Sequence, residues 1–108
     1  MKKIVLVFLI LLLVGCSSEN VYEIMKQNEH IILDVRTKEE YDSLHIKNSI
    51  NIPLDLIDES IDLDKDKIIF VYCKSGNRSK VAYNKLKELG YTVYDLGALA
   101  DIDLEKES

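Results

Sequence analysis

The chain lacks the residues and motifs that mark the common cofactor-binding classes of protein. It has only four glycines and two cysteines in 108 residues. It contains no glycine-rich dinucleotide fingerprint, no phosphate-binding P-loop and no cysteine and histidine cluster at metal-ligand spacing. The six tyrosines are scattered, so no aromatic stripe indicates base stacking or a cofactor box. We therefore expect the protein to need neither a metal nor an organic cofactor.

Positive charge is also scarce. The sequence has 14 lysines and arginines against 19 aspartates and glutamates, and its net charge is −5. Loss of Lys2 and Lys3 with a cleaved leader would remove two of those positive charges. An acidic chain argues against nucleic acid as a partner and against electrostatic docking on anionic lipid. The length allows one domain at most.

The first residues form a leader of the kind that directs export. Met1, Lys2 and Lys3 are followed by an uninterrupted apolar run from Ile4 to Val14, which is too short to span a bilayer comfortably. The ending, residues 13–16, resembles a bacterial lipobox. We expect residues 1–15 to be a lipoprotein signal peptide, with an uncleaved anchor as the alternative. Either interpretation predicts a membrane-anchored, extracytoplasmic protein of the cell envelope, held through its anchor.

Cysteine usage supports this interpretation. Lipidation of Cys16 would leave Cys73 without a disulfide partner. Residues 16–19 would then form a short lipidated tether before a domain at residues 20–108. An unpaired cysteine in an oxidising compartment needs a reason. A sulfur-carrying nucleophile supplies one.

The rest of the chain alternates between strand and helix patterns. Predicted helices begin after Asn20, after Thr37 and at Ser79. Glu40 completes a capping box with Thr37, and Gly90 is expected to cap the end of the last helix. A further helical turn or two is expected at residues 54–60. Predicted strands cover residues 30–35, 49–52, 68–72 and 91–96. The alternation predicts an α/β fold, with a mostly parallel central sheet and helices on both faces. The charged segment 62–67 is expected to be solvated surface; a calcium site there would lack the EF-hand glycine and terminal glutamate.

The stretch Cys73-Lys74-Ser75-Gly76-Asn77-Arg78-Ser79 links the third predicted strand to the last helix. Ligands of open α/β sheets bind at the carboxyl ends of the strands. In a short loop the backbone N–H groups can turn inward as an anion-binding nest, and the helix N-terminus adds its positive dipole end. The thiol of Cys73 is therefore expected to have a lowered pKa and to act as a thiolate nucleophile. The alternative is a small buried hydrophobic residue at a strand end.

Several segments in order resemble the rhodanese-like sulfurtransferases. The cysteine stretch resembles their active-site loop. Two upstream segments also resemble segments of that family. The first is Asp34-Val35-Arg36-Thr37 with Glu40-Tyr41, and the second is His45-Ile46 with Ser49-Ile50-Asn51-Ile52-Pro53. Residues 89–97 resemble their final strand. The resemblance covers about residues 20–102 and implies a rhodanese-like fold.

The resemblance also implies a reaction. Cys73 would take the outer sulfur of a small anionic donor such as thiosulfate, become a persulfide, and pass the sulfur to cyanide or a thiol. A partner protein's persulfide is a further possible donor. The loop's backbone N–H groups would stabilise the anionic persulfide. The substrate-binding residues would be Lys74, Ser75, Gly76, Asn77, Arg78, Ser79 and Arg36.

Three polar residues outside the loop are expected to be chiefly structural. The resemblance implies that Asp34 and Arg36 brace neighbouring loops by hydrogen bonds and an ion pair, and that His45 supports its own segment. The alternatives are a catalytic carboxylate and cation for Asp34 and Arg36, and a general base paired with Cys73 for His45. His30 is expected at the surface.

Two rival functions remain open at this point. Tyrosine-type phosphatases and arsenate reductases use a similar cysteine cradle, but the phosphatase loops carry five residues between cysteine and arginine, whereas here residues 74–77 are four. The smaller ring suits a single sulfur atom. The other rival is a non-catalytic rhodanese-like binding module, although such modules often lose the cysteine. The C-terminal tail also departs from the family, because Ala98 and Ile102 stand where a glycine and a tryptophan are usual.

Overall fold

A computed structural model describes residues 20–108 of the chain. The predicted signal peptide at residues 1–15, the lipidation site Cys16 and the tether at residues 16–19 lie outside the described residues. Within residues 20–108, no helix has both the length and the apolar character required to cross a membrane.

The described chain alternates helices and strands, as the sequence predicts. In chain order the elements are α2 (Val21–Gln27), β1 (His30–Asp34), α3 (Lys38–Ser43), β2 (His45–Ile46), β3 (Ile50–Asn51), the 3-10 helix η1 (Leu54–Leu56), β4 (Ile68–Cys73), α4 (Asn77–Glu88), β5 (Thr92–Ala98), the 3-10 helix η2 (Leu99–Asp101) and β6 (Lys106–Glu107).

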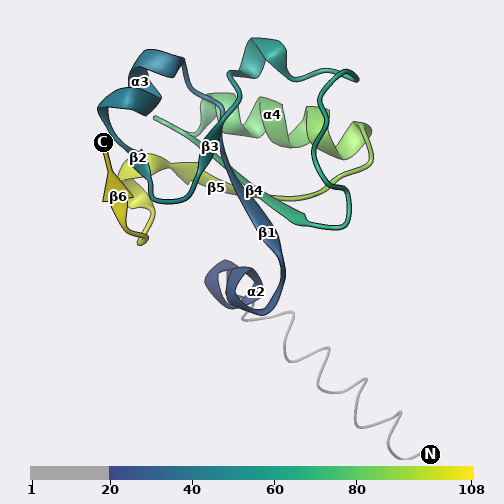
Figure 1. The fold of residues 1–108 in the computed structure, drawn as a ribbon, viewed down its shortest axis with the longest axis horizontal. Coiled ribbons are helices and arrows are strands. Elements are labelled where there is room, and N and C mark those ends of the chain that lie inside the picture. The colour runs from purple at the N-terminus through teal and green to yellow at the C-terminus, as the bar shows by residue number, and fades with distance from the viewer. Residues whose placement is uncertain (1–19) are drawn as a thin grey trace, which may run out of the picture.

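The central sheet has four parallel strands in the order β3-β1-β4-β5 (Figure 1). β4 lies in the middle and pairs with β1 along its length, with Leu33 opposite Val71. The carboxyl ends of the parallel strands meet at one edge of the sheet, which is where ligands of such sheets bind. The predicted α/β class with a mostly parallel central sheet is confirmed.

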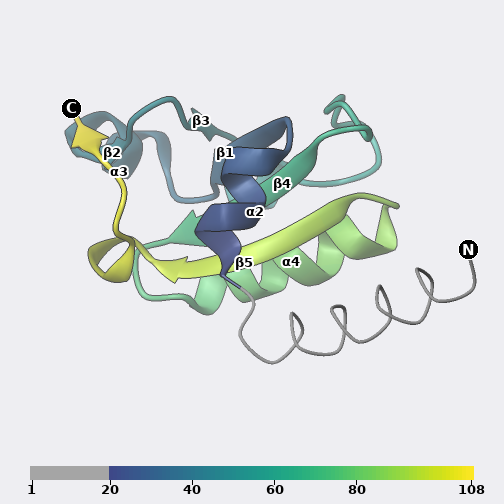
Figure 2. The same cartoon turned by 90° about the horizontal axis from the view of Figure 1, so that it is seen from below.

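Both faces of the sheet are buried, and β4 shows how. Its residues alternate between two apolar clusters, because successive side chains of a strand point to opposite faces. Ile69, Val71 and Cys73 join the cluster under α4, whereas Phe70 and Tyr72 join the cluster under α2. Figure 2 shows α2 crossing one face of the sheet while α4 lies behind the other. The predicted helices on both faces are thus present, and Cys73 ends β4 on the α4 side.

Local capping signals in the sequence correspond to the ends of three helices. The Asn20 side chain caps α2 by accepting from the Tyr22 N–H at 2.8 Å. Thr37 and Glu40 form the predicted capping box at the start of α3. Gly90, with φ of 95°, follows the last turn of α4 in a left-handed conformation and donates its N–H to the Lys87 carbonyl.

Element boundaries differ from the prediction by more than one residue in three places. α4 begins at Asn77 rather than at Ser79, because Gly76 turns the chain with φ of 97°. The predicted helical segment 54–60 forms only the 3-10 turn η1, and β5 runs to Ala98 instead of ending at residue 96. The two-residue strands β2 and β6 were not predicted, because neither is long enough to show an alternating pattern.

The unusual tail packs closely on the domain. Ile102, which stands where the family usually has tryptophan, is 3% exposed and belongs with Leu99 to the cluster under α2. Beyond it, β6 pairs antiparallel with β2. The smaller side chain is therefore still buried in the core on the α2 face of the sheet.

Candidate active site

The backbone turns sharply between β4 and α4, and this turn positions Cys73. The cysteine is the last residue of β4, and only Lys74, Ser75 and Gly76 separate it from the first turn of α4. Because Gly76 has no side chain, it cannot cap the helix as serine or asparagine would. The sulfur of Cys73 takes that place.

The Cys73 sulfur accepts two backbone hydrogen bonds. The N–H of Gly76 donates to Sγ at 3.0 Å, and the N–H of Ser79, in the first turn of α4, donates at 3.3 Å. These donors stand at the positive end of the helix dipole, where a negative charge is favoured. The arrangement stabilises the sulfur as a thiolate, which is the nucleophilic form.

The balance of effects lowers the pKa of Cys73. Burial by itself raises the pKa of the thiol, but hydrogen bonds from the side chain and backbone of Ser79 and from the backbone of Gly76 and Ser75 outweigh it. The Ser79 hydroxyl has a single proton. It can donate either to the sulfur or to the Gly76 carbonyl oxygen, which lies 3.1 Å away. The thiolate is therefore favoured mainly by hydrogen bonds.

Arg78 is held by a carboxylate from another element. Its guanidinium donates to both carboxylate oxygens of Glu40 in α3, at 2.7 and 3.0 Å. The Arg78 side chain lowers the pKa of Glu40 to about 2, with help from the backbone and hydroxyl of Thr37. We expected Arg78 to attract an anionic donor, but much of its charge is compensated by Glu40. The pair joins α3 to the start of α4 and so fixes the active-site turn.

A second, buried pair lies below this turn. Asp34 is fully buried and accepts from the backbone N–H, Nε and Nη2 of Arg36, with the Nη2 distance 2.6 Å. Arg36 Nη2 also donates to the Leu44 carbonyl oxygen at 2.6 Å. Burial tends to lower the pKa of Arg36, but the hydrogen bond and charge of Asp34 raise it overall. The contacts of Asp34 brace the end of β1 against the chain after α3.

His45 lies away from the sulfur and is occupied by other partners. Its ring stacks on Tyr41 with centroids 3.8 Å apart, its Nδ1 lies 2.7 Å from the Tyr41 carbonyl oxygen, and its Nε2 lies 3.5 Å from Glu107. None of its described contacts involves Cys73. His30, expected at the surface, is half-buried with its ring edge against Phe70.

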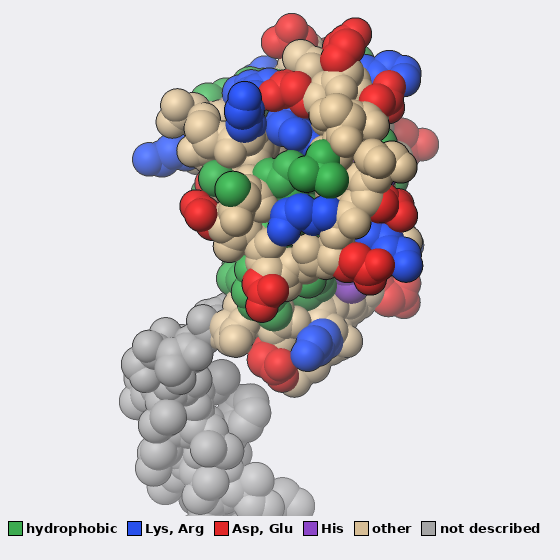
Figure 3. Space-filling model, turned by 90° about the vertical axis from the view of Figure 1, so that its left-hand side faces the viewer, with side chains coloured by type: hydrophobic (Ala, Val, Ile, Leu, Met, Phe, Trp, Pro, Cys, Tyr) green, Lys and Arg blue, Asp and Glu red, His purple; other side chains and the backbone are tan. Residues whose placement is uncertain are grey.

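A cavity of about 600 Å³ opens beside the active-site turn. It is lined by residues of the turn, α3 and the tail: Arg36, Glu40, Ser43, Leu44, Lys74, Leu99, Ala100 and Lys106. Figure 3 shows this face, with hydrophobic side chains near its centre and Lys and Arg side chains on either side of them. Cys73 itself is fully buried, so a substrate can reach the sulfur only if neighbouring side chains move aside.

The remaining predicted site residues occupy the turn in different ways. Lys74, Ser75 and Asn77 are exposed, whereas Ser79 is fully buried. Among residues 20–108, Lys74 forms no ion pair, which leaves it as the uncompensated cation of the turn. Within residues 20–108, no three or more His, Cys, Asp or Glu side chains are grouped so that they could hold a metal.

Sequence reasoning assigned no role in the site to two residues that the structure places beside it. Glu40 was recognised as a helix cap and as part of a family-like segment, but not as the partner of Arg78. Tyr72 was seen only as part of a strand. Its hydroxyl accepts from the Ile46 N–H at 3.1 Å and lies 3.1 Å from the Ser49 hydroxyl, which ties β2 and the turn before β3 to β4.

Comparisons with known proteins identify relatives of this fold and site. A model of the rhodanese-like domain matches residues 17–99. Thiosulfate sulfurtransferase PspE of Escherichia coli is 43% identical over an alignment of 82 residues, and the match covers 72% of this chain and 78% of that protein. The adenylyltransferase and sulfurtransferase uba4 of Ogataea parapolymorpha is 39% identical over an alignment of 74 residues, and the match covers 67% of this chain but only 19% of that protein. A structure described as rhodanese with anions from E. coli has a TM-score of 0.67 at 34% identity, covering 73% of this chain and 98% of that one.

Proposed function

The chain belongs to the family of rhodanese-like domains, and from this premise we propose that it is a sulfurtransferase that works through a persulfide of Cys73. The observation that carries the proposal is the sulfur at the start of α4, which accepts N–H donors from Gly76 and Ser79. A thiolate held in this way is ready to attack, and it is equally well stabilised when it leaves again.

The reaction has two half-steps. First, the Cys73 thiolate attacks the outer sulfur of thiosulfate; a new S–S bond forms, the original S–S bond breaks, and sulfite leaves with that bond's electron pair. In the second step, cyanide attacks the outer sulfur of the persulfide and departs as thiocyanate. The Cys73 thiolate is released, and the same N–H donors stabilise it as the leaving group. With a thiol as acceptor, the thiol's proton ends on the product persulfide.

The electrostatics of the turn favour an anionic donor. Lys74 is exposed and unpaired among the described residues, so it is the cation best placed to attract a dianion such as thiosulfate. Arg78, in contrast, is engaged with Glu40 and serves chiefly to hold the turn in shape. Both N–H donors converge on one atom, which agrees with transfer of a single sulfur.

Intact-mass analysis tests the proposal. The protein is expected to gain one sulfur atom after incubation with thiosulfate and to lose it when cyanide is added. Cys73→Ser should do neither, because a serine hydroxyl is a far weaker nucleophile at neutral pH. Hydrolysis of an aryl phosphate without any sulfur transfer would replace this function with a phosphatase. If neither activity nor a mass gain is found with thiosulfate or polysulfide, the domain is a binding module.

We also propose that the protein is a lipoprotein anchored in the cell envelope through Cys16. The support is the basic start, the apolar run and the small Gly15 before Cys16 in the sequence. Labelled fatty acid is expected in the unaltered protein and not in Cys16→Ala. Equal labelling of the two proteins would show that this assignment of the anchor is wrong.

A further inference from the structure

The cavity beside the active-site turn is larger than the sulfur-transfer reaction requires. Its volume of about 600 Å³ lies within the range of about 300–1,000 Å³ typical of sites for organic ligands. Cyanide and thiosulfate are far smaller. Leu44, Leu99 and Ala100 give the cavity an apolar wall, so it suits an organic molecule with an apolar part.

The charged residues of the cavity do not balance one another. Arg36 is paired with the buried Asp34, and Glu40 is paired with Arg78. Lys74 and Lys106 have no carboxylate partner within 4 Å among residues 20–108. Two ammonium groups are therefore left uncompensated at the cavity, in a chain whose net charge is −5. This local excess of positive charge indicates an anionic ligand.

Lys106 comes from a part of the chain that the family match does not cover. The match ends at residue 99, and β6 follows it in the tail. Pairing of β6 with β2 brings Lys106 to the cavity. Its ammonium donates to the Ile102 carbonyl oxygen at 2.7 Å and lies 3.4 Å from that of Leu104, so the side chain is held in place. An ammonium has three donors, and a ligand can use the one that remains.

We propose that Lys106 and Lys74 form an anion-recognition subsite that selects small organic thiols carrying a carboxylate as sulfur acceptors. This inference rests on the proposed sulfurtransferase function. The acceptor's apolar part lies against Leu44 and Leu99, and its carboxylate binds the two ammonium groups. Its sulfur attacks the outer sulfur of the Cys73 persulfide, the S–S bond to Cys73 breaks, and Cys73 leaves as thiolate. The acceptor's thiol proton remains on the new persulfide, so no further reactant is needed.

A pair of thiols that differ only in charge tests the subsite. N-acetylcysteine carries a carboxylate, and N-acetylcysteine amide does not. Sulfite release from thiosulfate is measured against the concentration of each thiol, with rates corrected for the thiolate fraction. The unaltered protein is expected to show a KM roughly 3- to 10-fold lower for the carboxylate thiol. Added salt should reduce that preference, because both ammonium groups are partly accessible to solvent.

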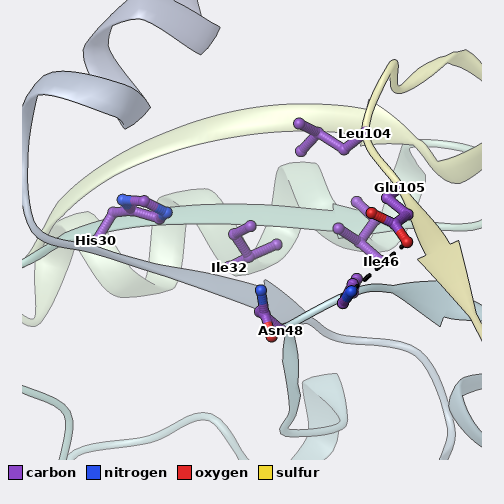
Figure 4. A pocket seen from close by; sticks show the side chains of 7 residues that line it. His30, Ile32, Ile46, Asn48, Leu104 and Glu105 are labelled. Atoms are coloured by element: carbon purple, nitrogen blue, oxygen red, sulfur yellow. Dashed lines mark ion pairs between the residues drawn. The ribbon is translucent and has the colours of Figure 1, made fainter.

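Variants separate the charge of Lys106 from its role in holding the tail. Lys106→Met should remove most of the preference, and Lys106→Arg should keep it. The matched control is Lys47→Met, because Lys47 also fastens the tail, through its ion pair with Glu105 at 3.6 Å. Lys47 lines a different hollow, where Figure 4 shows Glu105 beside Leu104 and Ile46. The preference should survive in this control.

Lys74→Met gives an independent arm, because Lys74 has no described contact with the tail, and it should weaken the preference in the same way. An unaltered protein without preference, or a preference unchanged in Lys106→Met, would overturn the subsite. Transfer to the protein dithiol of reduced thioredoxin but to neither small thiol would overturn it as well. These outcomes differ from failure of the proposed function, in which thiosulfate adds no sulfur to Cys73 at all.

Discussion

Replacing Glu40 with glutamine tests whether the ion pair with Arg78 holds the active-site turn. The change removes the charge but leaves an amide oxygen that can still accept the Thr37 N–H, so the helix cap is preserved. The ion pair lowers the pKa of Glu40 to about 2, whereas an unperturbed glutamate has a pKa of about 4.3.

The pKa difference sets the size and the pH range of the effect. Because the pKa is lowered in the folded state, the stabilisation is present above about pH 4.3 and is lost as the pH falls towards 2. The full difference corresponds to about 3 kcal/mol. The side chains of Arg78 and Glu40 are still 35% and 28% exposed. Solvent screening therefore reduces the expected contribution to about 1–2 kcal/mol.

Urea unfolding at pH 7 and at pH 3 measures this contribution. Glu40→Gln is expected to lower the free energy of unfolding by about 1–2 kcal/mol at pH 7, and by less than half as much at pH 3. Glu39→Gln is the matched control, because Glu39 lies in the same first turn of α3 and has no ion pair within residues 20–108. A loss that is the same at both pH values, or no larger than in the control, would refute the reasoning.

Three further substitutions test the site and its support. Ser79→Ala is expected to raise the pKa of Cys73, because a hydrogen bond that lowers this pKa is lost. The pH dependence of alkylation by iodoacetamide measures the pKa, and an unchanged curve would show that the Ser79 hydroxyl donates elsewhere. Gly76→Ala should cost about 1–2 kcal/mol in thermal unfolding, because φ is 97°, although an added Cβ would come no closer than an ordinary 3.9 Å to its nearest neighbour, the Gly97 Cα. Tyr72→Phe should cost about 1–2 kcal/mol in urea unfolding, because the buried Ile46 N–H loses its acceptor; a change of only a few tenths would contradict this.

The sequence alone was sufficient for the fold class and for placing Cys73 between a strand and the helix that follows it. Apolar runs such as residues 68–72 predict buried strands, and Thr37, Glu40 and Gly90 predict helix ends, because these signals act within one or two turns of chain. The loop from Cys73 to Ser79 could be recognised for the same reason. Its donors and its acceptor are only six residues apart.

The tertiary structure alone decided which distant residues complete the site. Glu40 and Arg78 are 38 residues apart, and nothing local to either residue indicates the other. Sheet order brings α3 beside the start of α4, and pairing of β6 with β2 brings Lys106 to the cavity. Hydrogen bonds and charge pairs between separate elements depend on how those elements pack, and a local sequence pattern carries no record of that packing.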